Sequence, residues 1–106
     1  MDAYIDIEKE LIPYRFDVSL AGVLFTFEIN YNAEDDYFTV DLERDQGVLV
    51  TGEKIVYGLP LFVDVADSRF PAISITPLDS SRATDTVSMA TLSGTVFLYI
   101  GAEEDA

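Results

Sequence analysis

The sequence predicts an all-β fold, a small antiparallel β-barrel or sandwich of about seven to eight short strands. Apolar and polar residues alternate with period two along most of the chain, the pattern of strands that bury one face. Turn signals rich in Gly, Asn and Asp separate these runs at short, regular intervals, and no long helical period is present. The chain is therefore expected to form layered sheets.

The first strands have the clearest alternation. Ala3, Ile5 and Ile7 alternate with polar or acidic neighbours. The runs 14–20 and 23–31 alternate on either side of a two-residue connection that contains Gly, which predicts a tight hairpin. Asn32 opens a polar turn, after which the alternation resumes. Further strands are predicted over 37–43, Val48–Thr51 and Ile55–Tyr57, with a bulge or bend at Gly52 between the last two.

The second half of the chain is less regular. Pro and Gly interrupt residues 58–71, within which Val63–Phe70 is predicted to form one helical turn. Ala72–Leu78 is predicted as a strand with Ile73 and Ile75 inward, and 79–93 as a loop with a turn near Met89–Leu92. The run Thr95–Ile100 is apolar on both faces, which indicates either a central strand or a strand whose outer face meets a partner.

Length and charge define one small acidic domain. The chain has 106 residues, and 20 Asp and Glu against 6 Lys and Arg give a formal net charge of −14. Disorder is not expected, because 49% of the residues are hydrophobic. We predict a single β domain over 1–101, followed by an acidic tail over 102–106 that is expected to be mobile.

The composition also excludes several functions. The chain has no His, Cys or Trp, so disulfides, Cys/His zinc sites and His-dependent catalytic triads are excluded. Six scattered cations do not form the basic patch that direct nucleic-acid binding requires. No signal peptide or membrane-spanning run is recognised. We therefore expect no enzyme, no cofactor, no bound nucleic acid and no membrane partner.

The carboxylates are interpreted as a solvated face, with calcium binding as the alternative. Hard cations need several oxygen ligands, and two acidic clusters offer them, although neither has the spacing of a twelve-residue calcium loop. The clusters are Asn30, Asn32, Glu34, Asp35 and Asp36, and Asp41, Glu43 and Asp45. The predicted acidic face comprises Asp2, Asp6, Glu8, Glu28, Asp41 and Glu43.

The segment 57–62 is unusually apolar for a connection. It either folds beneath the sheets or presents side chains to another subunit, because connecting loops are normally polar. Together with the last strand, which is apolar on both faces, it gives the predicted interface residues Tyr57, Leu59, Pro60, Leu61, Phe62, Phe97 and Tyr99. Phe16, Phe25, Phe27, Phe38 and Phe97 fall on predicted inward positions.

A series of short motifs resembles one family. The most distinctive is a glycine followed by an amphipathic strand and Gly-x-Pro-Leu, here residues 52–61. The other motifs are Phe16-x-Val-x-Leu-x-Gly22, Phe25-x-Phe-x-Ile-x-Tyr-Asn32, Phe38-x-Val-x-Leu42 and Ile73-x-Ile-x-Pro-Leu-Asp79. Over nearly its whole length the chain is similar to the small baseplate plug family of tailed bacteriophages.

The resemblance implies a structural subunit that plugs or lines the central hub at the distal end of the tail. It implies partners among the baseplate and tail hub proteins, several copies around the tail axis with a trimer favoured, and a place in the virion after synthesis in the host cytoplasm. If the acidic face lines a channel, it would repel passing DNA within about 8–10 Å. The alternatives are an acidic DNA mimic that inhibits a host DNA-binding protein, and a glycan-binding module.

Overall fold

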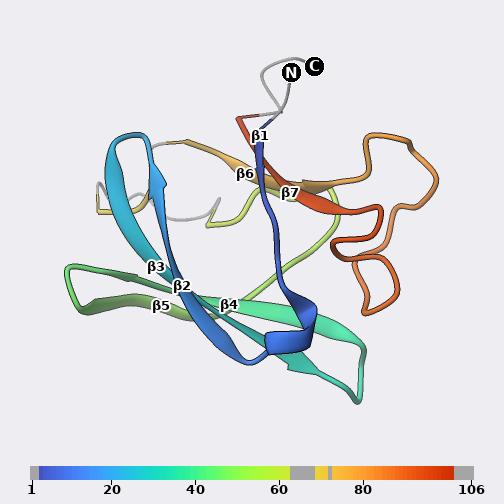
Figure 1. Cartoon of the computed structure of the whole chain (residues 1–106), viewed down its shortest axis with the longest axis horizontal. Helices are drawn as coiled ribbons and strands as arrows, with labels where there is room; N and C mark the ends of the chain where they lie inside the picture. Colours follow the sequence, from blue (N-terminus) through green and yellow to red (C-terminus); the bar gives the residue numbers. More distant parts are fainter. Residues whose placement is uncertain (1–2, 63–68, 72, 102–106) are drawn as a thin grey trace.

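The computed structural model describes residues 3–62, 69–71 and 73–101, and these form two antiparallel sheets (Figure 1). The larger sheet has four strands and the smaller sheet has three, in the order β1-β7-β6. The large sheet contains β2 (Tyr14–Leu20), β3 (Val23–Asn32), β4 (Tyr37–Arg44) and β5 (Gly47–Lys54). The small sheet contains β1 (Ala3–Ile5), β6 (Ile75–Leu78) and β7 (Phe97–Ile100).

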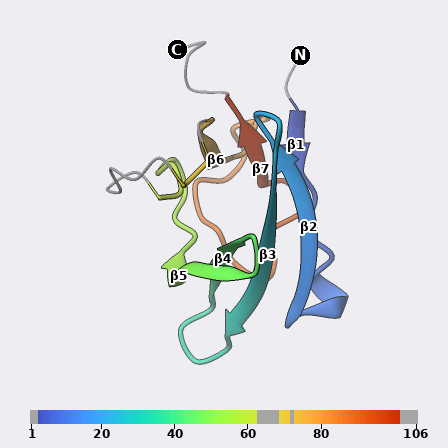
Figure 2. The same ribbon diagram turned by 90° about the vertical axis from the view of Figure 1, so that its left-hand side faces the viewer.

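The predicted all-β fold is confirmed, and the architecture is a sandwich. The two sheets do not close into a barrel, and they face each other across the core (Figure 2). The core is filled by alternate residues of β3 and β4, which meet inward residues of the small sheet. The buried side chains of the core include Phe25, Phe27, Ile29, Phe38, Val40, Leu42, Ile75 and Leu98. Burial of each such side chain contributes about 1.5–3 kcal/mol to the stability of the fold.

The large sheet is a meander in which each strand pairs with the next. The predicted hairpin is confirmed, with Tyr14 opposite Ile29 and Leu20 opposite Val23. Its two turn residues both have positive φ, 53° at Ala21 and 81° at Gly22. Such a turn twists in the same sense as the strands that it joins, which allows seven consecutive pairs to form.

The predicted bulge at Gly52 is also confirmed. Val40 lies opposite Glu53 whereas Leu42 lies opposite Val50, so β5 has one more residue than β4 in this interval. Gly52 has a φ of 72°, and its N–H donates to the Asp41 carboxylate at 2.8 Å. The predicted strand over Ile55–Tyr57 is wrong, because β5 ends at Lys54 and the chain turns at residues 57–58.

The strands of the small sheet are shorter than predicted. β7 is its central strand, which is one of the two interpretations that the two-faced apolar run allowed. It begins at Phe97 because Val96 N–H donates to Thr91 O, which holds the preceding residues in a turn. β6 begins at Ile75 rather than at residue 72. The predicted turn near 89–92 is present. Residue 72 and most of the predicted helical turn (63–68) lie outside the described residues. The structure also contains a short 3-10 helix, η1 (Lys9–Leu11), which the sequence did not predict.

Candidate interaction surfaces

The apolar segment 57–62 runs along the free edge of β6. Gly58 N–H donates to Pro77 O and Leu61 N–H donates to Ile75 O, both at 2.8 Å. This pairing turns Leu61 into the core, whereas Leu59 remains 47% exposed. The segment therefore extends the small sheet, and Leu59 is its most exposed apolar side chain.

The structure corrects the interface prediction for Leu61 and Phe62. Their exposed fractions are 6% and 8%, and both belong to the core cluster. Phe62 adopts a φ of 61°, which is uncommon for a bulky residue. Its N–H donates to the Glu53 carboxylate at 2.9 Å, and its ring packs edge-on against Phe27. These two residues hold the segment in place and expose little surface to a partner.

Tyr57 and Pro60, two other predicted interface residues, are half-buried. The Tyr57 ring packs against the core, and its hydroxyl accepts a hydrogen bond from Asp79 N–H at 3.1 Å. Tyr57 thus links the segment to the loop after β6.

An aromatic face covers the outside of the small sheet. We give this name to the side chains on the face of the small sheet opposite to Leu98, which are Tyr4, Thr76, Leu78, Phe97 and Tyr99. Tyr4 is exposed, whereas Thr76 and Tyr99 are buried, at 3% and 7%. The Tyr4 ring lies 4.5 Å from Phe97 and 5.6 Å from Tyr99, measured between centroids. Phe97 was expected to point inward, but its neighbour Leu98 takes the core position.

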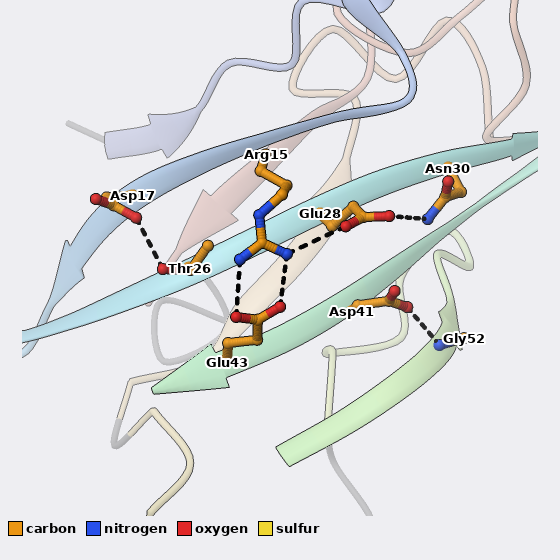
Figure 3. Close-up of polar contacts among 8 residues, drawn as sticks. All are labelled: Arg15, Asp17, Thr26, Glu28, Asn30, Asp41, Glu43 and Gly52. Atoms are coloured by element: carbon orange, nitrogen blue, oxygen red, sulfur yellow. Dashed lines mark hydrogen bonds and ion pairs between the residues drawn. The ribbon is translucent and has the colours of Figure 1, made fainter. Parts of the chain in front are cut away.

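A charged face covers the outside of the large sheet (Figure 3). We give this name to Arg15, Asp17, Glu28, Asp41 and Glu43, which come from three adjacent strands. The Arg15 guanidinium binds Glu43 in a bidentate pair, with N–O distances of 2.6 and 2.8 Å, and also contacts Glu28 at 3.2 Å. These hydrogen bonds lower the pKa of Glu43 and raise that of Arg15.

The predicted acidic face is only partly assembled. Glu28 lies directly opposite Asp41, and Glu43 joins them through Arg15. Asp6 and Glu8 instead follow β1 on the other sheet, and Asp2 lies outside the described residues. Asp17 is an additional acidic residue of this face that was not predicted; it lies on the same side of β2 as Arg15 and accepts a hydrogen bond from the Thr26 hydroxyl.

The two predicted calcium clusters are not assembled as metal sites. The described part of the chain contains no group of three or more acidic side chains arranged to hold a metal ion. Asn32 Oδ1 accepts the N–H of Asp35, and Asp36 Oδ1 accepts both the Tyr31 hydroxyl and Met89 N–H. These oxygens therefore stabilise the β3–β4 turn and tie it to the loop after β6.

The carboxyl groups with shifted pKa values are suited to structural roles. The pKa values of Asp36, Glu43 and Asp79 are all lowered, in each case chiefly by a hydrogen bond to a side chain. A catalytic general acid needs the opposite shift, a raised pKa.

None of the helices in the described ranges is long and apolar enough to cross a membrane.

A comparison with protein families shows the family to which the chain belongs. A family model described as cyanophage baseplate Pam3 plug gp18 matches residues 3–103. The chain belongs to this family. The resemblance found in the sequence motifs is thereby confirmed, and it covers both sheets of the sandwich. A search of curated proteins gave no match.

Proposed function

We propose that this chain is a non-enzymatic structural subunit that plugs or lines the central hub of a phage tail baseplate. The observation that carries the proposal is the match of residues 3–103 to a baseplate plug family. Family membership supports a structural role in the tail baseplate of the virion and association with other baseplate components. Several copies around the tail axis, with a trimer favoured, remain part of the proposal.

The edge segment supplies the proposed contact with the hub. Among the predicted interface residues of segment 57–62, only Leu59 keeps a largely exposed apolar side chain, at 47%. Gly58 and Leu61 fix the backbone on either side of it by their hydrogen bonds to β6. A side chain held on a rigid edge loses little further entropy when it is buried by a partner.

The experiment compares two exposed leucines on opposite sheets. Leu59→Asp should prevent incorporation of the chain into tails while the isolated domain keeps its melting temperature. Leu24→Asp is the matched control, because Leu24 is 59% exposed and lies on β3 of the large sheet. Equal incorporation of both variants would contradict the role of Leu59.

The charged face is proposed to be the surface turned towards DNA. Four carboxylates and one guanidinium leave it negative, so DNA that comes within a Debye length is repelled and does not adhere. Arg15 neutralises part of the face through Glu28 and Glu43, which reduces its negative charge for DNA repulsion and for DNA mimicry alike. Affinity capture from a host lysate separates the two: tail proteins support the plug, and a nuclease or repressor supports the mimic.

A further inference from the structure

Within the described part of the chain, β2 is the edge strand whose free edge is both long and regular. The edge of β6 is occupied by residues 57–62, through the hydrogen bonds of Gly58 and Leu61. β1 has only three residues, and the pairing of β5 with β4 is interrupted by two shifts of register. β2 instead forms seven consecutive pairs with β3, without a bulge or a proline. Natural edge strands are kept short, bulged or covered, so a regular free edge indicates a site for another strand.

The β2–β3 hairpin determines which backbone groups of β2 are unpaired. Because both residues of its two-residue turn have positive φ, Leu20 and Val23 close the turn as a hydrogen-bonded pair. Hydrogen-bonded and non-hydrogen-bonded pairs then alternate along the two strands. The N–H and C=O groups of Arg15, Asp17 and Ser19 therefore point to the free edge. All three residues are exposed, and no hydrogen bond from another described segment reaches these backbone groups.

The core is incompletely covered along the same edge. Tyr14, Phe16 and Val18 point inward from β2 and pack against the core, yet they are only half-buried. The residues opposite them on β3 are at most 1% exposed. A strand added beside β2 would cover the three half-buried side chains with its own inward residues, and these must be apolar.

The outward side chains of β2 determine which charge the added strand should carry. The Arg15 side chain lies over β3 and β4, where it binds Glu28 and Glu43, so it leaves the edge open and its charge is already paired (Figure 3). Asp17 is exposed, and among the described residues it accepts a single hydrogen bond, from the Thr26 hydroxyl. A Lys or Arg opposite Asp17 would therefore form a favourable cross-strand pair.

We infer that the free edge of β2 binds an extended segment of another baseplate protein, which adds a strand to the large sheet. Backbone hydrogen bonds to Arg15, Asp17 and Ser19 hold this segment, and its side chains alternate, with Lys or Arg opposite Asp17 between two apolar residues. The inference rests on the proposed place of the chain in the baseplate. A second copy does not fit, because two β2 edges paired antiparallel about their centres bring the two Asp17 carboxylates opposite each other.

Hydrogen exchange of the full chain, alone and in purified tail particles, tests this pairing. In the isolated chain the amides of Arg15, Asp17 and Ser19 should exchange fast, whereas those of Phe16 and Val18, which bond to β3, are protected. In particles the three edge amides should exchange more slowly by about tenfold or more. Fast exchange in both states would overturn the inference alone, whereas absence of the chain from particles would overturn the proposed function as well.

Ser19→Pro removes one N–H from the free edge and leaves the hydrogen bonds between β2 and β3 in place. It should reduce incorporation into particles by about tenfold or more. Ser19→Ala keeps the N–H and is the matched control, expected to incorporate as the wild type does. Equal incorporation of the two variants, both shown to be folded by melting curves, would contradict the inference. If Ser19→Pro does not fold, hydrogen exchange of the wild type decides.

Photo-crosslinking from a photoreactive amino acid in place of Ser19, in assembled particles, identifies the occupant. A cross-link to a different baseplate protein, within a segment where Lys or Arg stands between apolar residues, is the expected result. A cross-link to a second copy or to an acidic segment, or the absence of any cross-link, would overturn the inference.

Discussion

At the scale of single residues, one buried carboxylate organises the long loop after β6. Asp79 is 4% exposed, and its two oxygens accept hydrogen bonds from Ser81 N–H and Oγ–H and from Ala83 and Thr84 N–H, at 2.6–3.0 Å. The hydrogen bond from the Ser81 side chain is the main reason for the lowered pKa of Asp79. A loop that looks unpatterned in sequence therefore has a fixed conformation next to Tyr57.

Asp79→Asn is expected to destabilise the protein at neutral pH and to have less effect in acid. Because its folded pKa is lowered, Asp79 contributes stability above the unfolded value of about 4, and this contribution disappears as pH falls through the folded pKa. Urea unfolding at several pH values measures the effect. Asp35→Asn, at an exposed carboxyl of the β3–β4 turn, is the control. A gap between wild type and Asp79→Asn that stays constant down to pH 2 would contradict the assignment.

Thr76 provides the opposite case, a buried hydroxyl without a partner. Its residue is 3% exposed, and Oγ1 has no hydrogen-bond partner among the described residues. Thr76→Val keeps the shape of the side chain and removes the unsatisfied group, so we expect it to stabilise the fold by about 1 kcal/mol. Thr26→Val should not stabilise, because the Thr26 hydroxyl donates to Asp17 at 2.8 Å. Equal effects in chemical denaturation would argue against this explanation.

At the scale of elements, the bounds of a strand are predicted more accurately when its alternation of apolar and polar residues is longer. The hairpin β2–β3 and strand β4 were predicted to within one residue, because seven or more consecutive positions show the same parity. β6 and β7 have four residues each, and their bounds depend on hydrogen bonds made by neighbouring turns. Such tertiary pairing leaves little trace in local sequence.

The β2–β3 turn gives a prediction for backbone conformation. Ala21 has a φ of 53°, which costs an L-residue with a Cβ roughly 1–2 kcal/mol. Ala21→Asn should therefore stabilise the protein by about 0.5–1 kcal/mol, because Asn tolerates this region. Gly22→Ala, at a φ of 81°, should destabilise it by about 1 kcal/mol. Thermal unfolding of both variants is the measurement, and a more stable Gly22→Ala would show that the turn differs from this geometry.

The same limit applies to the candidate surfaces. Leu59, Leu61 and Phe62 lie in one apolar stretch, and parity cannot separate them because the chain turns within it. Only the pairing of Leu61 with β6 determines which side chain stays exposed. Phe97 was placed inward for a related reason, since a strand that is apolar on both faces does not show which face is the core.

At the scale of the whole molecule, the acidity of the chain is distributed unevenly. The charged face lies over the large sheet, the aromatic face lies over the small sheet, and the core separates them. A net charge alone could not reveal this division, because it depends on which strands share a sheet. We propose that the charged side is the one turned towards DNA.

We propose that the chain is built into the baseplate at the distal end of the tail. Electron cryo-microscopy of intact particles, with and without a small folded tag fused to this chain, is the test of this location. Extra density at the hub of the baseplate is expected in the tagged particles. Tagged density on the capsid or along the tail shaft, or purified particles that lack the chain altogether, would contradict it.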